Sequence, residues 1–240
     1  DVFPEEQVVF AQLSTGVVVM RFLLVEVETV TTTGVPTAQR PVADRAGGTV
    51  VIVTGRGFRN VSTAVCEFAG NPLYRSPATF VTPTELTCPV PAAQETDACL
   101  LQTVEISMNN FTFTTNEQTI NRPEAVVLER AAPQRVPLRI LEDPGRSDAD
   151  TFVVFGRGFV ASDALKCRLM TNGTSGETVV LGGRYLNSSA CECTLPKSRA
   201  WRPTSLGSYV QVALDGQVFS PTHVPMSLVG APATIKVLPE

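Results

Sequence analysis

Apolar and polar residues alternate along short stretches of this 240-residue chain, and glycines and prolines separate the stretches. Valine, threonine and phenylalanine occupy many of the alternating positions. A period of two is typical of strands with one buried face, and no window shows the longer apolar period of a helix between capping residues. The sequence therefore predicts an all-β protein, with strands that include residues 49–54, 103–107, 151–155 and 209–214.

The phrase Gly-Arg-Gly-Phe occurs at residues 55–58 and again at 156–159, each time after a predicted strand. A cysteine follows the second glycine of each copy by nine residues, at Cys66 and Cys167. A repeat period of about 100 residues is that of a whole domain and not of a solenoid. Because two alternating faces need cover in each copy, each is expected to close as a two-sheet sandwich.

Both copies continue through a second cysteine strand, at Cys88 and Cys193, to a closing hairpin of two apolar strands about a polar turn, at residues 103–113 and 210–219. Residues 8–19 resemble that hairpin, and residues 233–239 resemble the entry strand at 125–128. We therefore expect an excerpt of a longer array with Asn121-Arg-Pro123 as a linker. Its parts would be a preceding repeat's hairpin (1–20), domain 1 (21–122), domain 2 (123–230), and a following entry strand or linker (231–240).

The composition excludes some functions. Apolar residues make up 43% and charged residues 18%, which suits ordinary globular cores. The net charge is −4 and no basic stripe is present, so binding to nucleic acid is not expected. No apolar run is long enough to span a membrane, so no membrane span is expected within this chain.

The repeated motifs resemble the IPT/TIG family, immunoglobulin-like domains found in plexins, in Met-type and fibrocystin-like receptors, and in Rel-type transcription factors. The family pattern is a Gly-Gly-Thr entry, a Gly-x-Gly-Phe turn, a Cys-x-Phe strand, a Cys-x-x-Pro strand end and a final hairpin. Copy one carries all of it from Gly47-Gly48-Thr49, whereas copy two has residues 147–151 at the entry and Leu169 at the aromatic position. The resemblance implies two tandem immunoglobulin-like sandwiches, with disulfides Cys66 to Cys88 and Cys167 to Cys193.

Two cysteines remain, Cys99 and Cys191. They pair with each other, remain buried thiols, or Cys191 replaces Cys193 as the partner of Cys167, because residues two apart on a strand face the same side. A zinc site is disfavoured, since Cys191 and Cys193 are too close in sequence and His223 is far away. No metal or other cofactor is expected.

Four Asn-x-Ser/Thr sequons are candidate glycosylation sites, at Asn60, Asn110, Asn172 and Asn187. Together with paired cysteines they favour an oxidising, extracellular or cell-surface location. A cytosolic β-protein with buried thiols is the alternative.

The glycines of the repeated phrase, Gly55, Gly57, Gly156 and Gly158, are expected to adopt the positive φ of a tight reversal, and Phe58 and Phe159 to plug the sandwich. A phosphate loop is excluded because no helix and no Lys-Ser/Thr follows.

No catalytic residue is expected. The single histidine, His223, has no nucleophile motif near it. The acidic run at residues 142–150 is interpreted as a solvated loop in preference to a calcium site, because it contains Arg146 and a Pro-Gly turn.

Three functions compete. The first is a non-enzymatic extracellular scaffold or adhesion segment that meets protein partners or further copies of itself along an array. The second is an accessory carbohydrate-binding module, for which Trp201 is the candidate sugar platform. The third is a dimerisation or DNA-contact domain of a transcription factor, which the sequons, the paired cysteines and the negative charge oppose.

Overall fold

The computed structural model describes residues 6–13, 16–33, 40–94, 101–138, 151–171, 178–195 and 207–230. In these residues every regular element is a β-strand, so the all-β prediction is confirmed. None of them forms a helix of the length and apolarity that crossing a bilayer requires. Asn172, Cys99, Trp201, the acidic run at 142–150 and the segment 231–240 lie outside the described residues.

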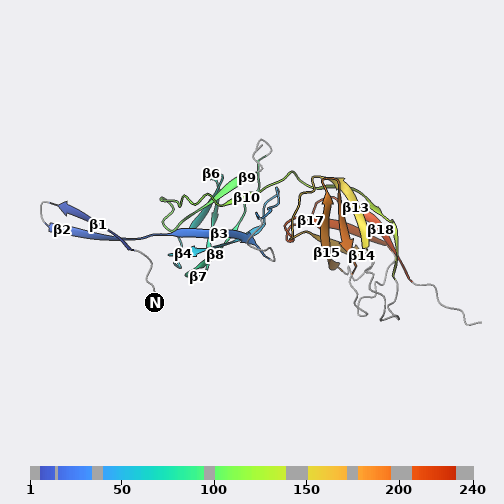
Figure 1. The fold of residues 1–240 in the computed structure, drawn as a ribbon, viewed down its shortest axis with the longest axis horizontal. Coiled ribbons are helices and arrows are strands. Elements are labelled where there is room, and N and C mark those ends of the chain that lie inside the picture. Colours follow the sequence, from blue (N-terminus) through green and yellow to red (C-terminus); the bar gives the residue numbers. More distant parts are fainter. Residues whose placement is uncertain are drawn as a thin grey trace, which may run out of the picture. The chain divides into compact units, whose positions relative to one another are not determined.

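The chain divides into two compact units, residues 1–124 and 125–240. In unit 1, two four-stranded sheets face each other as a sandwich (Figure 1). One sheet has the order β3-β4-β8-β7 and the other β10-β9-β5-β6. The strands are β3 (Glu26–Thr32), β4 (Val50–Arg56), β5 (Val65–Phe68), β6 (Asn71–Pro77), β7 (Thr79–Thr82), β8 (Glu85–Pro89), β9 (Leu101–Ser107) and β10 (Thr119–Asn121).

Alternation places the core of unit 1 between its sheets. Val51 and Val53 of β4 point inward, as do Val104 and Ile106 of β9, and all four are fully buried. They pack in one cluster with Phe58, the phenylalanine of the repeated phrase. The predicted plug is therefore part of the core, as is its counterpart Phe159, which is also buried.

Unit 2 repeats this strand order but joins the two layers into one eight-stranded sheet, β11-β13-β16-β15-β14-β17-β18-β12. The two layers of the expected sandwich are present in unit 2, but one strand that passes between them links them into one ladder. One long strand, β15, pairs with β14 at its start and with β16 at its end. The strands are β11 (Val127–Ala132), β12 (Arg135–Leu138), β13 (Thr151–Arg157), β14 (Lys166–Thr171), β15 (Thr178–Asn187), β16 (Ala190–Thr194), β17 (Gly207–Ala213) and β18 (Val224–Gly230).

The residues at the point where the chain passes from one layer to the other explain why the strand is interrupted in unit 1 and continuous in unit 2. In unit 1 the position is Pro77-Ala78, where β6 ends at the proline because proline has no N–H for the ladder. In unit 2 it is Gly182-Gly183, which β15 runs through without interruption. The Gly183 N–H donates to the Leu165 carbonyl at 3.1 Å, as the Ala78 N–H donates to the Ala64 carbonyl at 3.0 Å, so the two crossings occupy equivalent places.

The returning strands of the closing hairpins lie further along the chain than expected. The expected return at Phe113 and its counterpart at Phe219 are not strands; β9 pairs with β10 and β17 pairs with β18 instead. After the turn, the Thr114 hydroxyl accepts from the Ile106 N–H at 2.9 Å, and the Ser220 hydroxyl accepts from the Val212 N–H at 3.2 Å. A side chain thus replaces a backbone carbonyl, and the regular ladder stops there.

The opening hairpin is present as two antiparallel strands, β1 (Glu6–Leu13) and β2 (Gly16–Leu23), paired along their whole length. Its connection is much shorter than those of the closing hairpins, which span residues 108–118 and 214–223. Its likeness to them therefore does not extend to the turn.

The expected linker Asn121-Arg-Pro123 belongs largely to unit 1. Asn121 lies in β10, and Arg122 is 1% exposed. The Arg122 guanidinium donates to the Gln102 side chain at 3.0 Å and to the Pro91 carbonyl at 2.6 Å. These bonds anchor the end of unit 1, and the connection between the units begins after them.

Candidate functional site

The two glycines of each repeated phrase have different roles. Gly57 and Gly158 have φ near +81° and +85°, the left-handed conformation that a Cβ disfavours, as expected. Gly55 and Gly156 do not have positive φ. A Cβ on either would strike a backbone carbonyl of the preceding strand, that of Glu26 or of Val127. The first glycine of each pair is required by this close approach and not by its φ, which corrects that part of the prediction. Gly57 has both constraints, because a Cβ there would also meet the Leu24 carbonyl.

The structure contains the two disulfides that the family resemblance implies. Cys66 on β5 is bonded to Cys88 on β8, with Cα atoms 6.2 Å apart, so this bond joins the two sheets of unit 1. Cys167 on β14 is bonded to Cys193 on β16, with Cα atoms 5.9 Å apart. All four cysteines are fully buried, so each disulfide lies inside its core.

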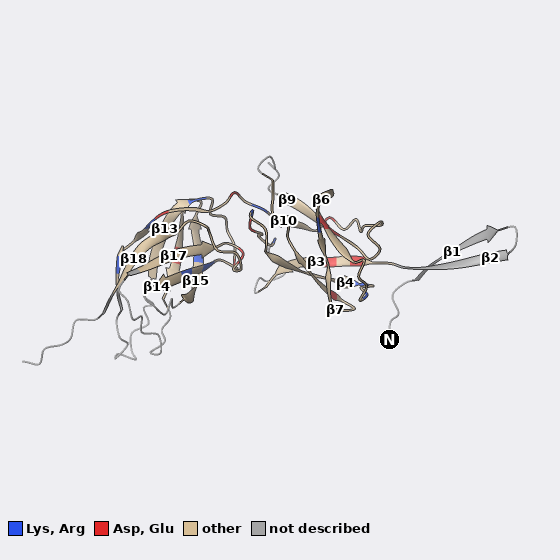
Figure 2. Ribbon diagram, turned by 180° about the vertical axis from the view of Figure 1, so that it is seen from behind, with Lys and Arg blue, Asp and Glu red and all other residues tan. Residues whose placement is uncertain are grey.

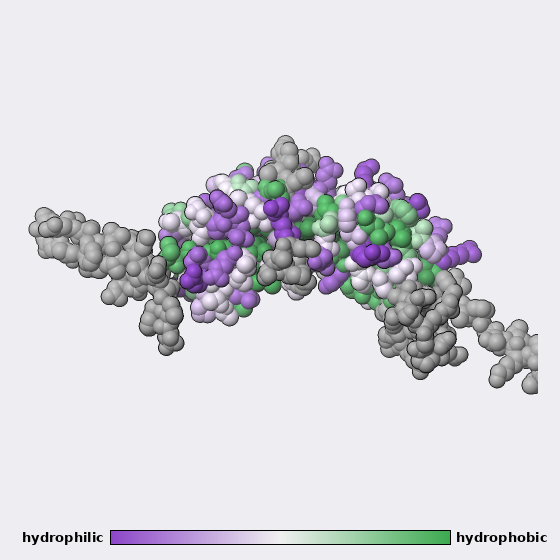
Figure 3. Space-filling view, in the orientation of Figure 1, coloured by the Kyte–Doolittle hydropathy of each residue, from purple (hydrophilic) through white to green (hydrophobic). Residues whose placement is uncertain are grey.

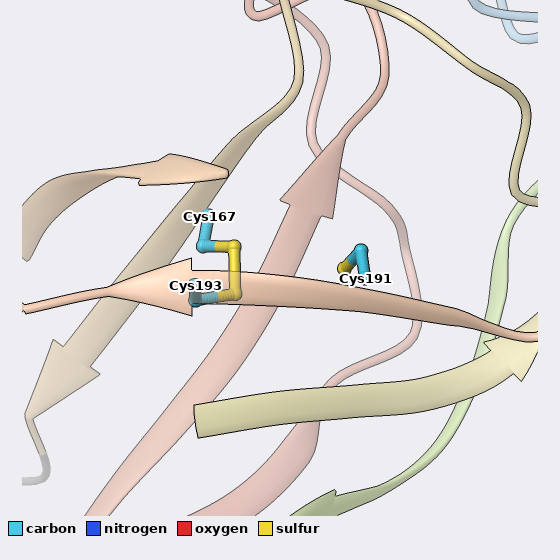
Figure 4. Close-up of side chains that lie close together, drawn as sticks. All are labelled: Cys167, Cys191 and Cys193. Carbon is cyan, nitrogen blue, oxygen red and sulfur yellow. A yellow bond between two sulfur atoms is a disulfide. The ribbon is translucent and has the colours of Figure 1, made fainter. Parts of the chain in front are cut away.

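Cys191 is a free, buried thiol two residues before Cys193 on β16 (Figure 4). Its sulfur and those of Cys167 and Cys193 all lie within 4.8 Å of one another. Burial raises the pKa of the Cys191 thiol to about 12, so it stays protonated and unreactive at neutral pH. The three sulfurs do not form a thiolate metal site in this state, because two of them are bonded to each other. Cys191 occupies the core position that Leu86 holds in unit 1, which is a packing role.

The three sequon asparagines in the described residues, Asn60, Asn110 and Asn187, are all exposed. Asn110 has φ +61°, a conformation that asparagine tolerates better than most residues, and its counterpart in unit 2 is Gly216 at +71°. The Oδ1 atom of Asn187 accepts from the backbone N–H and the hydroxyl of Ser189 at 2.9 and 2.8 Å. These bonds use the oxygen and not the amide nitrogen to which a glycan is attached.

A polar cluster on the outer face of the β10-β9-β5-β6 sheet was not predicted. The Arg75 guanidinium pairs with Glu67 at 2.6 Å and stacks on the Phe113 ring, 4.5 Å from its centre. Beside them, Glu105 accepts from the Thr114 hydroxyl at 2.7 Å. The pKa of Glu105 is raised above its ordinary value, chiefly because burial penalises the carboxylate.

Unit 2 has an equivalent cluster of different composition. The Arg168 guanidinium stacks on the Phe219 ring at 4.1 Å and donates to the Gln211 side chain. Arg168 and Gln211 stand where unit 1 has Glu67 and Glu105. The sequence offers one indication of these clusters, which is that a phenylalanine recurs at the same place in both closing segments, at Phe113 and Phe219.

The other predicted candidates show no chemistry in the described residues. His223 is exposed and its ring meets that of Tyr209 edge-on, with centres 4.7 Å apart. A depression of about 220 Å³ is lined by Gln134, Arg135 and residues 225–227. Lysine, arginine and acidic residues are scattered over both units in Figure 2 and form no basic stripe in the described parts.

Both units are therefore immunoglobulin-like sandwiches pinned by a buried disulfide. Residues 40–121 match the sequence model of the IPT/TIG domain family. Unit 1 thus contains an IPT/TIG domain, and unit 2 repeats its strand order and its disulfide pairing.

Solved structures of plexin A4 resemble the chain. The full extracellular region, domains 1 to 10, matches 86% of this chain at 15% identity with a TM-score of 0.50. A second structure of that region, with domains 1 to 8, matches 82% at 16% identity with a TM-score of 0.46. This chain spans only 16% and 18% of those two chains. At 15% identity the likeness to the first structure concerns the fold alone.

A surface glycan-binding protein from Prevotella bryantii is a more distant match. It covers 83% of this chain and 42% of its own at 10% identity, with a TM-score of 0.30. No curated protein sequence matches the chain.

Proposed function

We propose that this chain is a non-enzymatic extracellular segment of a repeat-built surface glycoprotein, in which tandem IPT/TIG domains act as a scaffold for adhesion. Its outer surfaces meet protein partners or further copies of the same array. The observation that carries the proposal is the pair of fully buried disulfides at equivalent places in the two units. Structural disulfides of this kind persist in oxidising compartments and are rare in the cytosol.

The sequons support the same location. Asn60, Asn110 and Asn187 are exposed, as a glycan requires, and Asn172 belongs to the same set by its sequence. We propose that N-linked glycans occupy these sites. A DNA-contact function receives no support, because the net charge is −4 and the described surface has no basic stripe.

Each disulfide limits how far its domain extends under load. The bonded cysteines are 22 positions apart in unit 1 and 26 apart in unit 2, and the chain between them cannot lengthen while the bond is intact. For a fully extended chain, each disulfide therefore reduces the length gained on unfolding, by roughly 75 Å in unit 1 and roughly 90 Å in unit 2. A segment that keeps its length when pulled is suited to hold binding surfaces at fixed spacing.

The first test is secretion from eukaryotic cells, followed by peptide mapping without reductant and by glycopeptide mass spectrometry. We expect Cys66 linked to Cys88, Cys167 linked to Cys193, and sugar on Asn60 and at least one other sequon. Free thiols at all four cysteines together with bare asparagines would refute the extracellular location.

The second test is single-molecule stretching of the same material. Two unfolding steps are expected, each lengthened by reductant by about the lengths given above. Steps that do not change on reduction would refute the mechanical role but not the location.

A further inference from the structure

Large apolar side chains are exposed directly beside the sequon asparagines. Phe111, next to Asn110, is 87% exposed, and Val61, next to Asn60, is 38% exposed. In unit 2, Leu186 precedes Asn187 and is 38% exposed. Each of the three sequon asparagines in the described residues therefore has an exposed large apolar neighbour. Apolar residues appear among polar ones over the visible face of both units in Figure 3, so exposure alone does not mark these sites.

The positions of unit 2 that correspond to the sequons at Asn110 and Asn60 have neither a sequon nor an exposed large apolar residue. Asn110-Phe111-Thr112 corresponds to Gly216-Gln217-Val218, which has no sequon and no exposed large apolar residue. Asn60-Val61-Ser62 corresponds to Ala161-Ser162-Asp163, to which the same applies. At these two turns the apolar exposure accompanies the sequon. At the third site it does not, because Val81, the unit 1 counterpart of Leu186, is 47% exposed beside Thr82, where unit 1 has no sequon.

The turn at Asn110 holds the asparagine and the phenylalanine in fixed positions. The Asn109 side chain accepts from the Phe111 and Thr112 N–H groups at 2.9 and 2.8 Å. The Thr63 hydroxyl donates to the Met108 carbonyl at 2.6 Å, which ties this turn to the loop that carries Asn60. Arg75 contacts the Asn110 Oδ1 atom at 3.5 Å and leaves the amide nitrogen for a sugar.

We propose that the first sugar of the N-glycan on Asn110 covers the Phe111 ring, and that Val61 and Leu186 are covered in the same way by glycans on Asn60 and Asn187. The proposal rests on the glycosylation in the proposed function. A hexosamine ring has an apolar C–H face and a polar rim, so it removes an aromatic face from water while its hydroxyls stay solvated. The glycans then form part of the domain surface.

The test compares glycoprotein variants secreted from the same cells. Thr112→Ala removes the sequon without touching Asn110, which is preferable to Asn110→Gln because φ at that position is +61°. Phe111→Ser removes the ring but keeps the sequon. Phe111→Tyr is the conservative control, which keeps both ring and sequon.

With Phe111 present, Thr112→Ala is expected to lower the Tm of unit 1 by about 2–6 °C. Combined with Phe111→Ser, the same substitution is expected to cause less than half of that shift, and combined with Phe111→Tyr the full shift. In the glycosylated protein, NMR should show protons of the first sugar shifted upfield by the ring.

Two outcomes overturn the inference and are distinguishable. If mass spectrometry finds Asn110 occupied but the Tm shift is the same with and without the ring, the sugar does not cover Phe111 and the proposed function stands. If Asn110, Asn60 and Asn187 are all bare in the secreted protein, the inference and the glycoprotein assignment fail together.

Discussion

The two units stack an arginine on the same phenylalanine position but supply it from different strands. In unit 1 the guanidinium over Phe113 comes from Arg75 on β6. In unit 2 the guanidinium over Phe219 comes from Arg168 on β14. This strand corresponds to β5 of unit 1, which has Glu67 at the same position. The position of the phenylalanine ring is thus the same in both units, whereas the arginine that stacks on it comes from a different strand in each.

The cores differ in a similar way. Leu86 of unit 1 is replaced in unit 2 by Cys191, beside the disulfide. One domain therefore has a spare thiol within reach of its disulfide and the other has none among its described residues. Substitutions at matched positions test how much these differences matter.

The largest contrast is expected between Cys88→Ala and Cys193→Ala. The first leaves Cys66 without its partner in unit 1 and should cost about 3 kcal/mol in the free energy of unfolding, since a loop of 22 residues is no longer closed. The second should cost less, because Cys167 can pair with Cys191 during oxidative folding, before the thiol is buried, and the folded domain holds the two sulfurs within 4.8 Å. Urea unfolding and peptide mapping without reductant measure both effects.

The control is Cys191→Ala added to Cys193→Ala. The double variant should lose about as much stability as Cys88→Ala, because no second thiol remains near Cys167. If Cys193→Ala alone already loses that much and Cys167 is found free, the proximity of Cys191 has no consequence.

The next contrast lies within each repeated phrase. Gly55→Ala and Gly156→Ala should each cost about 2–3 kcal/mol, because the new methyl meets a backbone carbonyl that the sheet holds in place. Gly158→Ala should cost about 1–2 kcal/mol from its positive φ. Thermal unfolding of the four single variants, Gly57→Ala included, measures the order. Gly57→Ala should cost at least as much as Gly55→Ala, because its methyl would also meet the Leu24 carbonyl. An equal loss at Gly156 and Gly158 would contradict the close-approach role of Gly156.

The arginine stacks should give a smaller contrast. Arg168→Ala removes a cation–π contact worth about 0.5–1 kcal/mol. It also leaves the Gln211 side chain without the donors of Arg168. Arg75→Ala should cost somewhat more, because the group that it leaves without a partner is the charged Glu67 carboxylate, whose side chain is only 10% exposed, and not a neutral amide. Arg75→Lys keeps the charge and should recover part of the loss. Chemical unfolding at low and high salt measures these differences, and equal losses at the two arginines would show that the Glu67 pair adds no more than the Gln211 bonds.

The smallest expected effect depends on pH. Because the pKa of Glu105 is raised, the folded state binds its proton more tightly than the unfolded state, and stability should fall as pH rises from about 4.5 through the raised pKa. Gln211 stands at this position in unit 2 and does not titrate. Glu105→Gln should therefore flatten this part of the pH profile of unit 1, by less than about 1 kcal/mol for a partly solvated side chain. An unchanged profile would show that Glu105 is not its source.

The sequence predicted the features that depend on alternation and repetition. Val51, Val53, Val104 and Ile106 are buried as a period of two requires, and the cysteine pairing follows the family resemblance. It did not predict the interrupted hairpins, because Phe113 and Phe219 look like strand residues. Their rings instead stack on arginines whose positions depend on the pairing of β6 and β14. Such contacts between distant strands leave no local pattern.

The joined sheet of unit 2 bears on self-association. In unit 1 the break at Pro77 leaves β6 and β7 as edge strands whose unpaired backbone groups are templates for another chain. Prolines at 72, 77 and 83 interrupt this margin, and a proline offers no N–H to an added strand. In unit 2, β15 runs through both margins without a proline, and among the described strands its residues 178–181 pair only with β14 and its residues 183–187 only with β16. Within the described part of the chain, each half of β15 therefore keeps one unpaired side without a proline to block it, so this margin is more open to an added strand in unit 2 than in unit 1.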